Sequence, residues 1–351
     1  MNTNTLRSVF DKLHIISTYD HILLLTHTDL DGAGPVILLK SVIHNVSVRY
    51  CSNNRMDSEI KNAISEKTAK TFDAIVICDI SPSEETAELI EENPYNQKII
   101  LIDHHASAMW LNKYNWAVVT DKIPSDSDRN SFYIDDNAVK NAHTSATGLL
   151  YDYLDITGHT VKFKNKALAL CMTHTISAYD CWDWVNIFNS AKSYKSFNNL
   201  FYIYGNEIFE KKMIKKLKSE NTELLDETDK MFLQIDEKKR NASLELIKPS
   251  IKKGKITIDD KTYSITITAN ASNCIPDTFA YMREQYPDAD IHFIITTYSI
   301  AMRTNKPDID LSVIAKRFGG GGHPGAAGIP IELTKQLDIV SNIMSANINI
   351  D

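Results

Sequence analysis

The stretch KIILIDHH, residues 98–105, joins an apolar run to an acid and two adjacent histidines, and it decides how this chain folds. Its isoleucines and leucine are typical of a buried central strand in a parallel sheet. Ligands of open α/β sheets bind beyond the carboxyl ends of the strands. The stretch therefore predicts a strand that places Asp103, His104 and His105 at a functional edge.

Two further apolar runs precede this strand, and each also ends in polar residues. HILLLT at 21–26 leads to His27, and DAIVICD at 73–79 ends in Asp79. Helical patterns lie near 33–44, 55–70 and 83–93, with a further candidate strand at 47–52. Strands that alternate with helices form βαβ units, so the sequence predicts an α/β fold with a parallel sheet and helices on both faces.

The length of 351 residues favours two domains, because single hydrophobic cores stop growing near roughly 250–300 residues. Residues 1–185 are expected to form the parallel-sheet domain, in which the polar segment 121–141 is an excursion that could act as a lid. A charged helical pattern over 204–232 predicts a mostly solvated helical connector within 186–240.

A smaller α/β domain with a mixed sheet is expected over residues 241–351. Its strand patterns lie at 255–260, 262–268 and 290–303, and its helical patterns lie near 275–286, 309–318 and 334–346. Consecutive glycines allow backbone N–H groups to approach an anion closely. Gly320, Gly321, Gly322 and His323 therefore predict a phosphate-binding loop, and the planar guanidinium of Arg303 suits the same ligand.

Charge and cysteine content exclude several classes of function. The formal net charge of −7 argues against a broad basic face for long duplex nucleic acid. The five cysteines show no C-x-x-C spacing, which fits free thiols in the reducing cytoplasm better than disulfides. No apolar run approaches the roughly 18–20 residues that span a bilayer, so no contact with a membrane is expected.

The residues that follow the strands predict a metal site: His27, Asp29, Asp31, Asp79, Asp103, His104 and His105. In a parallel sheet they meet at one edge, where their negative charges repel one another unless cations lie among them. Histidine and aspartate without cysteine suit Mn²⁺, with Mg²⁺, Co²⁺, Fe²⁺ or Zn²⁺ as alternatives. The number of ligands suits two ions, and Asp79 is placed to bridge them.

These motifs resemble those of the DHH phosphoesterase superfamily. HTDLDGAG at 27–34, Asp79 and DHH at 103–105 follow the order of its first three motifs. AYDCWDW at 178–184 resembles the fourth motif, and FGGGGHPGAAG at 318–328 resembles the glycine-rich signature of the DHH-associated domain. The resemblance therefore covers both expected domains.

The resemblance implies that two divalent ions, usually manganese, are held by His27, Asp29, Asp31, Asp79, His104 and Asp180, with Asp183 as the alternative to Asp180. Asp79 and His104 would thus be catalytic, together with His105, which faces the substrate phosphate. Arg303 and the glycine loop would bind the other end of the substrate. Many members form homodimers, and the sequence leaves the oligomeric state open.

The two-domain layout resembles most the members of the superfamily that degrade nano-RNA. We therefore expect a metal-dependent phosphodiesterase that hydrolyses short oligonucleotides to mononucleotides with a metal-activated water. Two alternatives stay open: hydrolysis of a small nucleotide such as adenosine 3′,5′-bisphosphate or a linear or cyclic dinucleotide, and a nucleotide-binding sensor without turnover. Trp182 and Trp184 are expected to lie in the core rather than to stack on bases.

Overall fold

The computed structural model describes residues 5–331 except 53, 134–135, 184–190, 221–222, 259 and 270–273. The chain divides into two compact units, Met1–Leu233 and Gln234–Asp351. In the described ranges, none of the helices combines the length and the apolar character that crossing a bilayer requires. All five cysteines are free thiols.

The first unit contains a five-stranded sheet in which every pair of neighbouring strands is parallel, in the order β2-β1-β3-β4-β5. The strands are β1 (His21–Thr26), β2 (Asn45–Tyr50), β3 (Ala74–Cys78), β4 (Ile99–Asp103) and β5 (Ala117–Val119). The predicted parallel-sheet α/β fold is confirmed. The sequence did not reveal β5, because three residues carry too little pattern.

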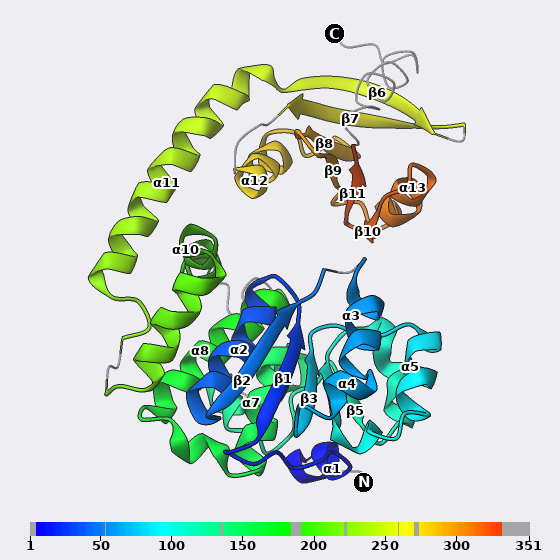
Figure 1. The fold of residues 1–351 in the computed structure, drawn as a ribbon. Helices are drawn as coiled ribbons and strands as arrows, with labels where there is room; N and C mark the ends of the chain where they lie inside the picture. The colour runs from blue at the N-terminus through cyan, green and yellow to red at the C-terminus, as the bar shows by residue number, and fades with distance from the viewer. Residues whose placement is uncertain are drawn as a thin grey trace. The chain divides into compact units, whose positions relative to one another are not determined.

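Helices cover both faces of this sheet (Figure 1). Ile22 and Leu24 of β1 belong to a core with α2, α7 and α8, whereas Leu23 and Leu25 belong to the opposite core with α3, α4 and α5. Successive side chains of a strand point to opposite faces, so a strand covered on both sides must be apolar throughout. The helices of the two faces are α2 (Leu30–Val42), α7 (Ala146–Ile156), α8 (Lys166–Asp180), α3 (Met56–Ala63), α4 (Glu66–Ala69) and α5 (Glu84–Glu91).

Helix α10 (Ala191–Leu217) belongs to the first unit and packs in its core, so it is not a solvated connector. Phe209, Met213 and Leu217 recur every fourth residue and are buried in the core that contains α2 and α8. The helix bends at Gly205, where φ is 68°. The expectation of a mostly solvated helix from residue 204 onward is therefore wrong for α10, because its many charges hid a narrow apolar stripe.

The lysine-rich part of α10 neutralises a buried acid. Nζ of Lys212 and Nζ of Lys216 lie 2.5 Å and 3.1 Å from the carboxylate of Asp229, which is fully buried on α11 (Glu227–Ile247). A buried carboxylate needs such partners to stay charged. These two lysines therefore connect the helices.

The polar excursion over 121–141 is anchored on α7. It contains the 3₁₀ helix η3 (Asp128–Phe132) and α6 (Asp136–Asn141). Arg129 is 1% exposed, and its Nε and Nη2 donate to the carboxylate of Asp152 at 3.2 Å and 2.5 Å. Removing either partner would leave an uncompensated buried charge, so this pair holds the centre of the excursion in place.

The second unit contains a six-stranded mixed sheet in the order β10-β11-β9-β8-β7-β6, as predicted in class. Only the β7 and β8 pair is parallel among the described strands of this sheet. The strands are β6 (Lys252–Ile258), β7 (Lys261–Ala269), β8 (Ile291–Ile295), β9 (Ser299–Arg303), β10 (Gly321–His323) and β11 (Ala326–Pro330). The run 290–303 thus forms two strands, and the glycine-rich stretch forms a hairpin of its own.

Helices α12 (Ile275–Gln285) and α13 (Leu311–Arg317) pack on this sheet in separate apolar clusters. The helix predicted near 334–346 lies outside the described residues. The remaining short helices are α1 (Leu6–Phe10), η1 (Asn96–Lys98), η2 (Ala106–Lys113), η4 (His159–Lys162) and η5 (Lys248–Ser250).

Candidate metal centre

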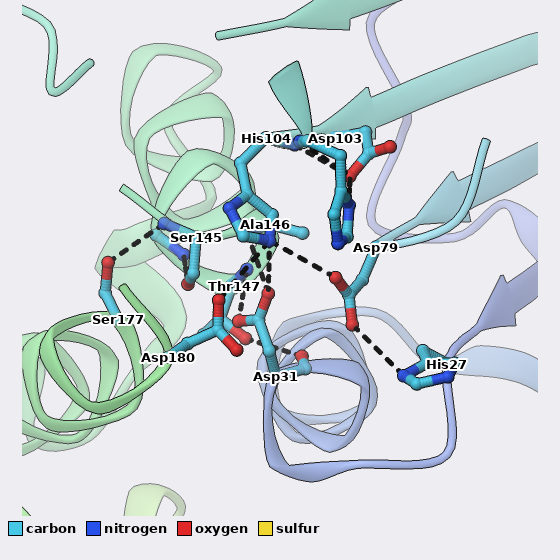
Figure 2. A network of polar contacts seen from close by, with 12 residues as sticks. His27, Asp31, Asp79, Asp103, His104, Ser145, Ala146, Thr147, Ser177 and Asp180 are labelled. Atoms are coloured by element: carbon cyan, nitrogen blue, oxygen red, sulfur yellow. Dashed lines mark hydrogen bonds and ion pairs between the residues drawn. The ribbon is translucent and has the colours of Figure 1, made fainter. Parts of the chain in front are cut away.

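The ends of three adjacent parallel strands bring the predicted residues together (Figure 2). The chain reaches His27 directly after β1, Asp79 directly after β3 and Asp103 at the end of β4. These strands are neighbours, so their carboxyl ends share one edge of the sheet. Asp31, in the first turn of α2, and Asp180, the last residue of α8, point into the same place.

His104 lies among three carboxylates. Its Nε2 is 3.3 Å from Oδ2 of Asp180, 3.5 Å from Oδ1 of Asp79 and 3.8 Å from Oδ2 of Asp31. Its side chain is mostly buried. A ring nitrogen and carboxylate oxygens at these separations can bind one divalent ion between them after small side-chain movements.

His27 forms a second group with two other acids. Its Nδ1 is 2.8 Å from Oδ2 of Asp29 and 4.0 Å from Oδ2 of Asp79. Asp29 also caps α2, because its Oδ1 accepts the N–H of Gly32 at 2.9 Å. Asp29 therefore has both a capping role and a place in the cluster, while Asp79 lies between the two imidazoles.

Asp79 carries the clearest sign that a cation belongs here. It is 5% exposed, its φ is 60°, and among the described residues its Oδ2 accepts no hydrogen bond. Burial, followed by the charges of Asp31, Asp29 and Asp180, raises the pKa of Asp79 well above its usual range. Burial and the nearby charges of Asp31 and Asp29 likewise raise the pKa of Asp180. A divalent ion would supply the positive charge that these buried carboxylates need in order to stay ionised.

The N-terminus of α7 holds the carboxylate of Asp31. The N–H groups of Ala146 and Thr147 donate to its Oδ2 and Oδ1 at 2.9 Å and 3.1 Å, and the Thr147 hydroxyl donates to its main-chain oxygen at 2.8 Å. A helix N-terminus favours an anion. A Cβ on Gly34 would lie 1.9 Å from Oγ1 of Thr147, so this close approach requires glycine. Sequence reasoning missed these partners because they act largely through the backbone.

A serine pair joins α7 to α8 (Figure 2). The N–H of Ser145 donates to Oγ of Ser177 at 3.0 Å, and Oγ of Ser145 accepts the N–H of Gly148 at 3.3 Å as the cap of α7. Ser177 lies one turn before Asp180 on α8. The α7 N-terminus is thus bonded both to Asp31 and to the helix that carries Asp180.

Asp103 orients the two histidines that follow it. Its Oδ1 lies 2.8 Å from Nδ1 of His105 and accepts the N–H of His104 at 2.7 Å, while the hydroxyl of Ser81 donates to its Oδ2. The hydrogen bond to Asp103 raises the pKa of His105 to about 9. The His105 side chain is 49% exposed. Its raised pKa favours a protonated ring, and the ring is half-exposed to solvent.

Asp183, the alternative to Asp180, lies away from these imidazoles. It is fully buried, and its Oδ2 accepts the N–H of His143 at 2.9 Å and the hydroxyl of Tyr133 at 3.5 Å. Its Oδ1 is 3.3 Å from Nδ1 of His143. Of the two acids, Asp180 is therefore the one that lies beside His104, at 3.3 Å, while Asp183 contacts the segment before α7.

Cys181 and Trp182, which follow Asp180, are not placed as the sequence led us to expect. The thiol of Cys181 lies within 4.8 Å of ligand atoms of His104 and Asp180, so the cluster includes a cysteine. Trp182 is 58% exposed with a φ of 63°, so its predicted place in the core is wrong, and Trp184 lies outside the described residues. The signal that could have indicated Cys181 is its position directly after the predicted ligand.

The predicted substrate-binding residues of the second unit lie on neighbouring strands. Arg303 on β9 pairs with Ala326 on β11, which pairs with His323 on β10. The structure describes the backbone of His323 and not its side chain. The guanidinium of Arg303 lies 5.0 Å from the ring centroid of Phe279. This places a half-buried cation beside the glycine hairpin.

Close backbone approaches require glycine at two positions of this stretch, Gly320 and Gly322. A Cβ on Gly320 would lie 2.1 Å from the carbonyl oxygen of Gly328, and one on Gly322 would lie 2.5 Å from that of Ala326. Gly322 also has a φ of 139°. A Cβ on Gly321 would meet nothing within 4 Å. The stretch is therefore a paired hairpin and not the free loop that its composition indicates.

A parallel α/β sheet with imidazoles and carboxylates gathered at its carboxyl edge is the arrangement expected of an α/β enzyme that binds divalent metal ions. Residues 21–176 match the DHH family, N-terminal domain. This match confirms the resemblance that the motifs predicted.

The known proteins to which the chain is similar include an oligoribonuclease. The chain is 29% identical to oligoribonuclease NrnB of Bacillus subtilis (strain 168) over 319 residues, which are 88% of this chain and 72% of that protein. The pGpG-specific phosphodiesterase PggH from Vibrio cholerae has a TM-score of 0.51 at 14% identity and covers 93% of this chain and 100% of its own. The exonuclease RecJ bound to manganese has a TM-score of 0.51 at 12% identity, and the match covers 98% of this chain and 94% of RecJ. The two structural likenesses show the fold.

Proposed function

We propose that this protein is a divalent-metal-dependent phosphodiesterase that hydrolyses short oligonucleotides to mononucleotides. The observation that carries the proposal is Asp79, a buried carboxylate that lies between two imidazoles and whose Oδ2 accepts no hydrogen bond from the described residues. The similarity to an oligoribonuclease over 88% of the chain supports the substrate class.

The donor set fits two divalent ions. His27 and Asp29 would hold one ion and His104 and Asp180 the other, with Asp79 shared between them. We favour Mn²⁺, because nitrogen and oxygen donors suit it and because a protein of the same fold, RecJ, is bound to manganese. Such a pair would polarise a phosphoryl group and activate water for attack on it. Asp31, 3.8 Å from His104, would complete the second group of ligands.

The residues around the ions would bind and orient the phosphate. His105 is half-exposed and has its pKa raised to about 9 by the hydrogen bond to Asp103, so at neutral pH it would donate to a phosphate oxygen. The same bond fixes the ring, since Asp103 is held in turn by Ser81. Arg303 and the glycine hairpin would bind a second anionic group of the substrate. The departing sugar oxygen would take its proton from solvent or from a nearby acid.

Short substrates are favoured by the charge of the chain. Long polymers need a basic track, and the formal net charge is −7. Within the lysine-rich stretch of α10, Lys212 and Lys216 pair with Asp229 and Lys211 pairs with Glu207, so these three charges are already compensated.

Metal analysis combined with a substrate length series tests this proposal. Chelator-treated protein is reloaded with Mn²⁺ and given labelled dinucleotides, pentanucleotides, twenty-nucleotide strands and adenosine 3′,5′-bisphosphate. We expect Mn²⁺-dependent hydrolysis that declines sharply with length, and labels at either end reveal the direction of cleavage. Equal rates on the longest strand would overturn the substrate class, and the absence of hydrolysis on all four would favour the sensor alternative.

We also place the protein in the cytoplasm, in keeping with its five free thiols. A homodimer stays a prediction that follows from the family resemblance. Size-exclusion chromatography with light scattering would test it directly.

A further inference from the structure

We propose that Cys181 makes one half of the metal centre thiophilic, so that this half binds Cd²⁺ or Zn²⁺ through sulfur as well as through nitrogen and oxygen. The inference rests on the metal centre of the proposed function. It adds a ligand that the nitrogen and oxygen chemistry described above does not use.

The end of α8 fixes where Cys181 lies. Asp180 is the last residue of the helix and Cys181 is its C-cap, whose N–H still donates to the carbonyl oxygen of Ser177 at 3.0 Å. The next residue, Trp182, has a φ of 63°, so the chain turns away only after the cysteine. Asp180 and Cys181 are therefore presented together by one rigid helix end.

The two halves of the centre differ in their donor atoms. His27, Asp29 and Asp79 place one nitrogen and two oxygens within 4.8 Å of one another. His104, Asp180 and Cys181 place one nitrogen, one oxygen and one sulfur within the same distance, and His104 also belongs to a group of nitrogen and oxygen donors with Asp79, Asp103 and His105. Oxygen donors favour hard ions such as Mn²⁺ and Mg²⁺, whereas a thiolate selects softer ions.

The separations allow all three atoms to reach one ion. Bonds of about 2.0–2.3 Å to nitrogen, oxygen and sulfur put the ligands of one tetrahedral ion about 3–4 Å apart. Nε2 of His104 and Oδ2 of Asp180 are already 3.3 Å apart. On binding, the sulfur forms a bond to the ion and the thiol proton passes to solvent, as coordination of a thiol requires.

Cys171 provides an internal control on the same helix. Among the described residues no other cysteine belongs to a group of candidate ligands, and three of the other four are buried: Cys51, Cys78 and Cys274. Cys171 is partly exposed, as Cys181 is, and lies ten residues earlier on α8. A reagent that reaches thiols from solvent should therefore report on these two.

Alkylation of the unmodified full-length protein is the first test. Chelator-treated protein is exposed to iodoacetamide with and without Cd²⁺, and peptide mass spectrometry gives the rate at each cysteine. We expect Cd²⁺ to slow the modification of Cys181 by about tenfold or more, because a thiolate bound to the metal cannot attack the reagent. The rate at Cys171 should not change. Equal rates at Cys181 with and without Cd²⁺ would overturn the proposal.

A Cd²⁺ titration is the second test. Ultraviolet sulfur-to-cadmium charge-transfer absorption should appear in the wild type and in Cys171→Ser and be lost in Cys181→Ser. The Cd²⁺ dissociation constant of Cys181→Ser should rise by about 10–100-fold, with a much smaller change for Mn²⁺. An unchanged band in Cys181→Ser would overturn the proposal, and if that variant does not fold by circular dichroism, the alkylation result decides.

Hydrolysis by the same wild-type preparation separates this inference from the function on which it rests. Without Mn²⁺-dependent hydrolysis the proposed function fails, whatever the Cd²⁺ spectra show. With Mn²⁺-dependent hydrolysis but no cadmium–sulfur band, the function stands and the thiophilic half is rejected.

Discussion

The first unit gathers acids at an edge of its sheet, whereas the second unit sets a cation beside a glycine hairpin on its own sheet. Burial and neighbouring carboxylates raise the pKa values of Asp79 and Asp180 well above their usual range. In the second unit, burial and then the nearby charge of Arg283 lower the pKa of Arg303. Each unit thus has an electrostatic requirement of its own. Under the proposed function, divalent ions would satisfy the first requirement and a phosphate group of the substrate the second.

The largest effect is expected where the first unit concentrates its charge. Asp79→Asn removes the carboxylate shared between the two imidazoles, so we expect Mn²⁺-dependent hydrolysis to fall by about 10³-fold or more. The metal-free variant should instead be more stable than the wild type at neutral pH, by about 1–3 kcal/mol, because a buried acid is replaced by a neutral amide. Activity assays and urea unfolding after chelation measure both. Unchanged turnover would show that the reactive centre lies elsewhere.

The stability gain of Asp79→Asn should depend on pH in a defined direction. The folded pKa of Asp79 is raised, so above the unfolded pKa of about 3.9 the folded state holds a proton that the unfolded state has released. The stability of the wild type therefore falls as pH rises through this window. We expect the difference between the variant and the wild type to be large at pH 7 and to vanish near pH 4. A gain that stays constant with pH would contradict this assignment.

A smaller effect on metal binding is expected for residues that contact the partners of the acids. Gly34→Ala would push Thr147 and the α7 N-terminus away from Asp31, since the added Cβ would lie 1.9 Å from Oγ1 of Thr147. We expect Mn²⁺ affinity to weaken by about 10–100-fold, as when the partners of metal ligands are removed. Isothermal titration measures this. Thr147→Ala, which removes the hydroxyl without the collision, is the matched control and should have the milder effect.

A substitution in the second unit should weaken the binding of the substrate and leave the binding of the metal unchanged. Gly320→Ala would force its Cβ to within 2.1 Å of the carbonyl oxygen of Gly328, so the hairpin must shift. We expect KM for a dinucleotide to rise about tenfold, equivalent to about 1.4 kcal/mol, with Mn²⁺ content unchanged. Gly325→Ala, whose Cβ would meet its nearest atom at 3.9 Å, is the control. Loss of bound metal in Gly320→Ala would contradict the division of roles between the units.

The smallest effect concerns a neutral buried group of the second unit. His292 is 1% exposed, its Nδ1 lies 2.6 Å from Oγ1 of Thr266, and burial followed by the charge of Arg283 lowers its pKa to about 4. The unfolded state binds a proton below about pH 6.5 and the folded state does not, so stability falls as pH drops through this window.

His292→Gln removes that dependence, because glutamine does not titrate. We expect the variant to gain about 1–2 kcal/mol relative to the wild type between pH 6.5 and pH 4. Amide hydrogen exchange of β7 and β8, corrected for intrinsic rates, reports on this unit alone. The same pH dependence in both proteins would show that His292 is not the group responsible. The expected signs are opposite for His292 and Asp79, which sharpens the contrast between the units.

Much of the first unit could be predicted because its strands are buried on both faces. Such strands must be continuous apolar runs, so β1, β3 and β4 are visible in the sequence together with the polar residues that end them. The glycine hairpin was not visible, since β10 is three residues long and its glycines carry no side chains to show a period. Helix α10 was misread because three apolar positions lay among many charges.

By itself the sequence determined that acids and imidazoles end adjacent parallel strands and that a glycine-rich segment belongs to a second α/β unit. Only the tertiary structure decided that Asp180 and not Asp183 faces His104, that the backbone of Ala146 and Thr147 holds Asp31, and that Cys181 joins the cluster. The physical reason is that backbone N–H groups are the same in every residue except proline, and the direction in which a helix end presents a side chain depends on how that helix is packed.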